Sequence, residues 1–308
     1  MGTPEFSVPA LRAVAERCTI TRVVTQPDRP AGRGRHLAES AVAREAVVLG
    51  LTVDKPADMR SPEVRDALAA DHADVFAVVA FGAILSPALL ALPRAGCLNL
   101  HGSLLPDYRG ASPVQRSLWD GVAETGVCTL FMDDGIDTGD VVLAARESVR
   151  DDDDAASLAA RLAALGGPLL AESCVLAHEG RAPRAPQDRS AGSYAKKLKK
   201  ADGAVDWALP AKTLWHHARA VTPWPGATAG HAGRRLIVLA SHPAQGRGAP
   251  GEVLAVDSSG ILVACGEDAL RLTSVKPEGR AACAAADWAR GARLAQGNRL
   301  DGGKEYLT

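Results

Sequence analysis

The feature that most constrains the fold is an almost continuously apolar run at residues 75–80. A run of this length is typical of a parallel β-strand that is covered on both faces. Helical patterns precede it at residues 41–49 and 62–70, and Ser61 and Pro62 suit the cap and first position of the second helix. Because strand and helix patterns alternate, we expect an α/β fold with an open, doubly wound, mostly parallel sheet that binds ligands beyond the carboxyl ends of its strands.

The chain is long enough for two domains, since it has 308 residues and 47% of them are apolar. We expect a first domain at residues 1–181, a linker rich in proline, lysine and small polar residues at 182–204, and a second domain at 205–308. Short strand patterns separated by turns predict a small antiparallel β-barrel in the second domain. These patterns lie at residues 236–240, 251–256, 261–265 and 269–275.

Composition argues against several classes of protein. No run of about 18 apolar residues occurs and no basic segment leads into an apolar one at the start, so we expect neither a membrane span nor a secretory signal. The six cysteines are scattered without a CxxC pair, which favours reduced, buried thiols in a cytosolic protein over disulfides or a zinc site. Gly32 and Gly34 lie in a loop that lacks the spacing of a phosphate-binding motif.

Charge is distributed unevenly, although the net charge is −1. Residues 1–189 carry 19 Lys and Arg against 26 Asp and Glu, a balance of −7, whereas residues 190–308 carry 16 against 10, a balance of +6. A basic unit attached to an acidic one suits electrostatic capture of a nucleic acid. Ordinary fluctuation of charge along a chain explains the same numbers equally well, so charge alone leaves the partner open.

The residues best suited to chemistry lie in a short apolar strand at residues 97–101 and in the loops that follow it. Glycine and proline within 102–106 stop the strand after His101. Asn99 and His101 are two positions apart, so both side chains leave an extended backbone on the same face. A loop at residues 132–140 holds four carboxylates, one of which can meet the imidazole. Each residue has an ordinary structural role when taken singly, and only the combination indicates a site.

Three motifs carry a resemblance to a known family. They are Asn99-Leu-His-Gly-Ser-Leu-Leu-Pro106, Arg109-Gly-Ala-Ser-Pro-Val-Gln115 and the aspartate loop from Asp133 to Asp140. Together they resemble the signature of the 10-formyltetrahydrofolate-dependent formyltransferases. Three further stretches resemble the branch of that family that formylates methionyl-tRNA, namely Gly2-Thr-Pro-Glu-Phe6, the segment from Thr25 to Arg35, and Thr222-Pro-Trp-Pro-Gly-Ala227. The similarity covers essentially the whole chain.

The resemblance implies a Rossmann-like formyltransferase domain followed by a tRNA-binding barrel that resembles the oligonucleotide-binding (OB) fold. The implied reaction transfers a formyl group from the co-substrate 10-formyltetrahydrofolate to the free amino group of methionine on initiator tRNA, for translation initiation. Asn99 and a protonated His101 would donate to the oxyanion, while Asp137 would hold His101 and relay a proton, without a metal. The enzyme is expected to be a cytoplasmic monomer with no membrane partner.

The resemblance also implies two sets of binding residues. The set expected at the folate comprises Phe81, Gly82, Ile84, Leu85, Ser103, Leu104, Leu105, Pro106, Asp133, Gly135 and Asp137. The set expected at the tRNA comprises Arg29, Arg33, Arg35, Lys196, Lys197, Lys199 and Lys200. The three arginines lie in a stretch with two prolines and two glycines, which predicts an exposed, mobile loop. Solvated surface charge is the other interpretation of these basic residues.

Two other functions stay open. Asn99, His101 and Asp137 would serve equally well in a formyltransferase that acts on a small amine, such as a ribonucleotide glycinamide or an amino sugar. The other candidate is a module that binds folate or tRNA without catalysis. The resemblance also implies a hydrophobic strand ahead of the turn at Gly2, so the first strand of the sheet is expected to be missing, at a cost in backbone hydrogen bonds and apolar burial.

Overall fold

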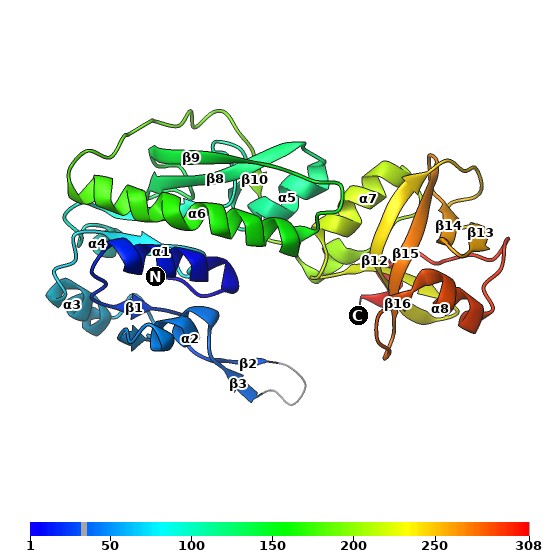
Figure 1. Ribbon diagram of the computed structural model, residues 1–308, viewed down its shortest axis with the longest axis horizontal. Helices are drawn as coiled ribbons and strands as arrows, with labels where there is room; N and C mark the ends of the chain where they lie inside the picture. The colour runs from blue at the N-terminus through cyan, green and yellow to red at the C-terminus, as the bar shows by residue number, and fades with distance from the viewer. Residues whose placement is uncertain (32–35, 308) are drawn as a thin grey trace. The chain divides into compact units, whose positions relative to one another are not determined.

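The computed structural model describes residues 1–31 and 36–307, which divide into two compact units (Figure 1). Unit 1 comprises Met1–Pro113, Glu124–Ser148 and Ala159–Ala195, and unit 2 comprises Val114–Ala123, Val149–Leu158 and Lys196–Thr308. The boundary in the second half of the chain therefore falls between Ala195 and Lys196. Each unit has its own sheet and helices.

Unit 1 begins with alternating helices and strands. In chain order they are η1 (Glu5–Ser7), α1 (Val8–Arg17), β1 (Val23–Val24), β2 (Arg29–Ala31), β3 (His36–Ala38), α2 (Ala41–Val48), β4 (Val53–Asp54), α3 (Pro62–Ala70), β5 (Phe76–Val78), α4 (Pro87–Leu90) and β6 (Cys97–His101). The predicted helices are confirmed as α2 and α3. Ser61 caps α3 by accepting the backbone N–H of Val64 at 3.3 Å, with Pro62 in the first turn.

The sheet of unit 1 is mixed. β1 pairs with β4 and β5 pairs with β6, both in parallel. Beyond β6 the direction reverses, because β8 (Glu124–Phe131) is antiparallel to β6 and β9 (Val141–Ser148) is antiparallel to β8. The open α/β architecture is confirmed, with parallel pairing at β1–β4, Gly2–Val79 and β5–β6 and antiparallel pairing on both sides of β8. An apolar run shows that a strand is buried on both faces and carries no information about its direction.

Met1 and Gly2 lie between β1 and β5. The N–H of Gly2 donates to the carbonyl of Val24 at 3.1 Å, and the N–H of Val79 donates to the carbonyl of Met1 at 2.9 Å. The amino group of Met1 donates to the carbonyl of Ala77 at 2.7 Å, and burial lowers its pKa to about 6. A cavity of about 540 Å³ adjoins these residues, lined by parts of α1, β1, β5 and α6.

Helix α6 (Ala155–His178) packs on this sheet through its middle turns. A Cβ atom added at Gly166 would lie 2.7 Å from the Leu100 side chain in β6, and one added at Gly167 would lie 2.8 Å from the carbonyl of Pro9 in α1. The two glycines therefore allow helix, sheet and α1 to approach closely. Among the described residues α6 is the one helix long and apolar enough to cross a membrane, and half of its most apolar window is buried inside the protein.

The remaining elements of unit 1 are short. β7 (Arg109–Gly110) pairs in parallel with β10 (Tyr194–Ala195), which brings the end of unit 1 back to the loop that follows β6. Helix α5 (Pro113–Asp120) begins at the last residue of this part of unit 1. The six cysteines are free thiols, as predicted, and four of them are buried.

Unit 2 contains a six-stranded antiparallel sheet with the order β11-β12-β15-β14-β13, to which β16 is added at β15. Its elements are η2 (Lys200–Gly203), α7 (Ala211–Ala220), β11 (Ala227–His231), β12 (Arg234–Ala244), β13 (Val253–Asp257), β14 (Gly260–Ala264), β15 (Ala269–Pro277), β16 (Cys283–Ala284), α8 (Ala285–Ala292) and η3 (Lys304–Tyr306). The four predicted strands are confirmed. Within residues 36–307 no pairing of β11 with β13 closes the sheet, so the predicted barrel is not confirmed as a closed one.

Candidate active site

Asn99 and His101 occupy the end of β6. This strand is nearly enclosed, since β5 lies on one side and β8 on the other, where His101 is opposite Cys128 and Asn99 opposite Leu130. The alternation of side chains in an extended strand places Asn99 and His101 on one face, as the sequence predicted. Both therefore lie at the carboxyl end of the parallel pair β5–β6, where α/β folds bind their ligands.

The carboxylate of Asp137 meets both residues. The amide nitrogen of Asn99 donates to Oδ1 of Asp137 at 3.2 Å, and Nδ1 of His101 lies 3.5 Å from Oδ2. The backbone N–H of Gly110 donates to the same Oδ2 at 2.8 Å. Asp137 has a left-handed backbone with φ of 55°, which is uncommon for any residue other than glycine. Its carboxylate thus takes a fixed position that local backbone preference would not select.

His101 is 5% exposed, and both of its ring nitrogens face acceptors in the protein. Nε2 lies 2.9 Å from the carbonyl oxygen of Tyr108 and must carry a hydrogen, since a carbonyl oxygen only accepts. A neutral ring would then present a lone pair to Asp137, whereas a protonated ring would present an N–H. The contact with Tyr108 was not predicted, because Tyr108 also has a positive φ of 59° that no sequence pattern indicated.

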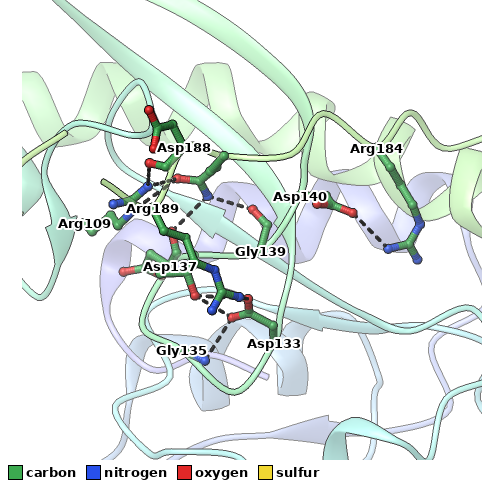
Figure 2. Close-up of polar contacts among 11 residues, drawn as sticks. Arg109, Asp133, Gly135, Asp137, Gly139, Asp140, Arg184, Asp188 and Arg189 are labelled. Carbon is green, nitrogen blue, oxygen red and sulfur yellow. Dashed lines mark hydrogen bonds and ion pairs between the residues drawn. The ribbon is translucent and has the colours of Figure 1, made fainter. Parts of the chain in front are cut away.

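The loop that carries Asp137 is fastened at several points (Figure 2). Asp133 accepts the N–H of Gly135 at 3.0 Å and the hydroxyl of Thr138 at 2.8 Å. Arg189 donates to the other oxygen of Asp133 at 2.8 Å. The carboxylate of Asp133 therefore binds residues of its own loop and Arg189, which orders the part of the loop that leads to Asp137.

Comparison with known proteins decides the family. The model of the formyl transferase family matches residues 6–173, and the model of the formyl transferase C-terminal domain matches residues 197–293. The chain belongs to the formyl transferase family. A methionyl-tRNA formyltransferase of Xanthomonas axonopodis pv. citri (strain 306) is 46% identical over 290 residues, which are 93% of this chain and 94% of that protein. A methionyl-tRNA formyltransferase of Jannaschia sp. (strain CCS1) is 43% identical over 302 residues, or 98% of each chain.

A solved structure agrees with this formyl transferase fold. The sugar 3N-formyl transferase WlaRD, crystallised in the presence of dTDP and 5-N-formyl-THF, aligns with a TM-score of 0.64 over 91% of this chain and 97% of its own. The two sequences are 14% identical, so the likeness concerns the fold alone.

The residues predicted at the folate of this formyl transferase differ in their surroundings. Phe81 and Leu85 are 3% and 5% exposed and belong to a hydrophobic cluster, whereas Ile84 is 87% exposed. Gly82 is exposed, and Ser103 is buried with its hydroxyl donating to the carbonyl of Asp107 at 2.6 Å. Half-buried positions are occupied by Leu104, Leu105 and Pro106. Of this set Ile84 therefore offers exposed apolar surface, whereas Phe81 and Leu85 are covered by the protein.

The 540 Å³ cavity near Met1 is a different place, because Asn99, His101 and Asp137 do not line it. Among the described residues no group of three or more His, Cys, Asp or Glu comes together to hold a metal ion. The groups that converge at the site are the amide of Asn99, the imidazole of His101, the carboxylate of Asp137 and the backbone N–H of Gly110.

The residues predicted at the tRNA lie in both units. Arg29 is exposed in β2 and donates to Gln26 at 3.1 Å. Part of the segment that was predicted to be a loop instead forms two strands, β2 and β3, which pair in an antiparallel manner. The two prolines of the segment had argued against strands there. Arg33 and Arg35 lie outside the described residues. The four lysines predicted there are all exposed and precede or begin η2, namely Lys196, Lys197, Lys199 and Lys200.

Two residues that donate hydrogen bonds to Asp137 were not predicted from the sequence, namely Gly110 and Gln187. The backbone N–H of Gly110 donates to the carboxylate of Asp137. In the sequence Gly110 had stood out only as part of the motif that begins at Arg109. Gln187 binds the backbone of Asp137 from 50 positions away, in the segment that was predicted to be a linker. A single glutamine in a polar stretch gives no signal that sequence patterns could have used.

Proposed function

We propose that this chain transfers the formyl group of 10-formyltetrahydrofolate to the α-amino group of methionine on initiator tRNA. The observation that carries the proposal is the convergence of Asn99, His101 and Asp137 from a strand end and a separate loop. It is supported by relatives of 43% and 46% identity that bear the name methionyl-tRNA formyltransferase and align over more than nine-tenths of the chain.

The chemistry needs little activation of the nucleophile. An α-amino group has a pKa of about 8 in model peptides, so a fraction of it is neutral at pH 7 and can attack the formyl carbon. The new C–N bond turns the formyl oxygen into an oxyanion, and the bond to N10 of the folate then breaks. One proton leaves the attacking amine and one reaches N10, which balances the reaction without a metal.

Asn99 and His101 are the proposed donors to the oxyanion. The amide of Asn99 has two N–H groups, and only one of them is needed for Asp137. The Nε2–H of His101 is proposed as the second donor, and it would exchange the carbonyl of Tyr108, its acceptor here, for the substrate oxygen. A preorganised donor of this kind contributes about 3 kcal/mol at the transition state. Asp137 lies between the two and is suited to pass the proton from the amine towards N10 through water.

The basic unit 2 provides the surface for tRNA. The exposed lysines at its start and Arg29 in unit 1 would neutralise phosphates, and Arg33 and Arg35 are proposed to join them. We infer that the sheet of unit 2 forms an OB-like barrel with the help of the chain near Leu300, which bonds to both edges. Its N–H donates to Gly251 beside β13 at 2.8 Å, and the N–H of Asp301 donates to Gly230 in β11 at 2.8 Å.

We propose the predicted functional division, with a catalytic domain at 1–181, a basic connection at 182–204 and a tRNA-binding domain at 205–308, and with residues up to Ala195 packed in the same compact unit as the candidate site. We propose that the enzyme acts as a cytoplasmic monomer. Folate binding is assigned to the predicted set, namely Phe81, Gly82, Ile84, Leu85, Ser103, Leu104, Leu105, Pro106, Asp133, Gly135 and Asp137.

The test is a formylation assay with labelled 10-formyltetrahydrofolate and three acceptors, namely methionyl initiator tRNA, glycinamide ribonucleotide and a dTDP-linked amino sugar. Formylation of the tRNA alone is expected. His101→Ala should lower kcat by about 100- to 1,000-fold while tRNA affinity changes little. Asp134→Asn is the matched control, because Asp134 is an exposed carboxylate of the same loop. Transfer to a small amine only, or full activity of His101→Ala, would reject the assignment.

A further inference from the structure

The side chain of Gln187 joins two parts of unit 1 that meet at the candidate active site. Its Oε1 accepts from Nε of Arg109 at 3.1 Å and from Nη2 at 3.0 Å. Its Nε2 donates to the carbonyl of Asp137 at 3.0 Å and to the carbonyl of Gly139 at 2.7 Å. A carboxamide has two donor hydrogens and two acceptor lone pairs, so every hydrogen-bonding position of Gln187 is used.

These hydrogen bonds also fix which way the carboxamide points. The reversed orientation would turn its NH₂ group towards the guanidinium of Arg109 and its oxygen towards two carbonyl oxygens. None of the four hydrogen bonds could then form, because a guanidinium only donates and a carbonyl only accepts. Gln187 therefore has one favourable arrangement, in which it is a rigid spacer between Arg109 and the loop that carries Asp137.

Arg109 is itself held by the segment that carries Gln187 (Figure 2). It is 8% exposed, and its guanidinium also donates to the carbonyl of Asp188 at 3.0 Å and to the carbonyl of Ala191 at 3.0 Å. Its backbone N–H donates to Ser193 at 2.9 Å. A buried cation is costly unless oxygens surround it, so the segment from 187 to 193 takes its shape around Arg109.

The same segment reaches Asp137 by a second route. β10 pairs with β7, and the carbonyl of Ala195 accepts the N–H of Ala111 at 2.9 Å, which sets the position of Gly110 between them. The N–H of Gly110 holds the carboxylate of Asp137, while Gln187 holds its backbone carbonyl. Residues 187–195 thus control both ends of a residue whose left-handed backbone needs external support.

We infer that Gln187 is a positioning residue for formyl transfer, which sets the backbone of Asp137 so that its carboxylate faces Asn99 and His101. The inference rests on the proposed function and extends the active site into the last segment of unit 1, which ends at Ala195. The essential feature is the pair of N–H groups that Gln187 gives to Asp137 and Gly139. Its acceptor oxygen, in contrast, serves the burial of Arg109.

Two substitutions separate these roles. Gln187→Glu keeps an acceptor for Arg109 but turns a carboxylate oxygen towards the carbonyls of Asp137 and Gly139. Gln187→Met removes the hydrogen bonds on both sides. If Gln187 positions Asp137, both variants lower kcat by about 10- to 100-fold with little change in KM for the folate or the tRNA, since displacement of a reacting group by 1 Å costs up to about 100-fold. If it only supports Arg109, Gln187→Glu keeps the wild-type kcat.

Arg184→Ala is the matched control. Arg184 belongs to the same segment and also reaches the aspartate loop, where its Nη1 lies 3.5 Å from Asp140 and its guanidinium covers the ring of Phe131 at 3.7 Å. It has no hydrogen bond to Asp137 among those of the described residues. A variant of Arg184 should keep kcat within about twofold, because exposed ion pairs contribute little.

The experiment measures kcat and each KM of the full chain for wild type, Gln187→Glu, Gln187→Met, Arg184→Ala and His101→Ala, with the midpoint of thermal unfolding for each. A reduced kcat in folded Gln187→Glu, with Arg184→Ala unaffected, supports the inference. Wild-type kcat in Gln187→Glu overturns it while leaving the proposed function intact, provided that His101→Ala is inactive. Failure of wild type to formylate methionyl-tRNA would overturn both. If Gln187→Met does not fold, Gln187→Glu decides alone.

Discussion

The amide of Asn99 donates to Oδ1 of Asp137 at 3.2 Å, although the two residues lie 38 positions apart. This hydrogen bond orients an amide that would otherwise rotate freely, and it leaves one N–H for a substrate oxygen. The two oxygens of this carboxylate have different partners, since Oδ1 accepts from Asn99 whereas Oδ2 accepts from Gly110 and faces His101. The site is therefore ordered by the protein before any substrate binds.

Asn99→Asp should be more harmful than its small change in size suggests. The replacement exchanges the amide that donates to Asp137 for a second carboxylate. Two negative charges then face each other, and the oxyanion loses a donor. We expect kcat to fall by more than about 100-fold for Asn99→Asp and to a similar extent for Asn99→Ala. Single-turnover formylation measures the effect, and a variant with wild-type turnover would remove Asn99 from the mechanism.

Gly110→Ala should damage both stability and turnover. Gly110 has φ of 106°, and an added Cβ would lie 2.9 Å from the carbonyl of Ala195 and 2.9 Å from the ring of Tyr194. The backbone must shift, which moves the N–H away from Asp137. Gly180→Ala is the control for backbone strain alone, because Gly180 has φ of 70° with nothing within 4 Å of the new Cβ.

We expect Gly180→Ala to lose about 1–2 kcal/mol of unfolding free energy with unchanged kcat. Gly110→Ala should lose more and also lower kcat. Urea unfolding together with the formylation assay provides the comparison. Equal behaviour of the two variants would mean that the close approach at β7 and β10 has no role in catalysis.

Stability should fall as the pH is lowered from 8 to 6. Burial lowers the pKa of the Met1 amino group from 8.0 to about 6. Below pH 8 the unfolded chain binds a proton that the folded protein takes up only near pH 6, so the free energy of unfolding decreases across this window, by at most about 3 kcal/mol. Urea unfolding at pH 8, 7 and 6 measures this slope.

The chain with an acetylated N-terminus is the control for that slope, because the two proteins differ only in the amino group, which acetylation prevents from binding a proton. We expect a shallower slope for the acetylated chain. Parallel slopes would show that the amino group of Met1 is hydrated in solution.

Binding of tRNA should depend on salt through the lysines at the start of unit 2. Substitution of Lys196, Lys197, Lys199 and Lys200 by alanine should reduce the slope of log Kd against log salt by up to about 4, or about one for each phosphate that is no longer neutralised. Filter binding of methionyl-tRNA at several salt concentrations gives the slope. Arg65→Ala, at an exposed position of unit 1, should leave it unchanged. An unaltered slope in the lysine variant would place the tRNA elsewhere.

Local chemistry explains which parts of the site could be predicted. The end of β6 at His101 follows from the glycine and proline behind it, and the shared face of Asn99 and His101 follows from the period of a strand. The choice of Asp137 among four loop carboxylates came from the family resemblance, and in the structure its carboxylate contacts Asn99 and faces His101.

The features that could not be predicted depend on distant parts of the chain. The direction of β8 depends on how the chain returns to β6, which an apolar run does not record. The positive φ values of Tyr108 and Asp137 are imposed by their surroundings, including hydrogen bonds from Gln187. A β2–β3 pairing that contains Pro30 contradicts the usual interpretation of proline, which is tolerated where its missing N–H is not required.

The position of Met1 and Gly2 has a mechanical consequence for unit 1. Their backbone hydrogen bonds connect β1 on one side to β5 on the other. The pair β1–β4 therefore joins the rest of the sheet through the hydrogen bonds of two residues. A junction between strands that has few hydrogen bonds opens more readily than a pair of strands with many. The amide hydrogens of Gly2 and Val79, which donate across this junction, should therefore exchange with solvent sooner than those of β6 and β8. Partial opening would begin at this junction while the strand that carries Asn99 and His101 stays closed.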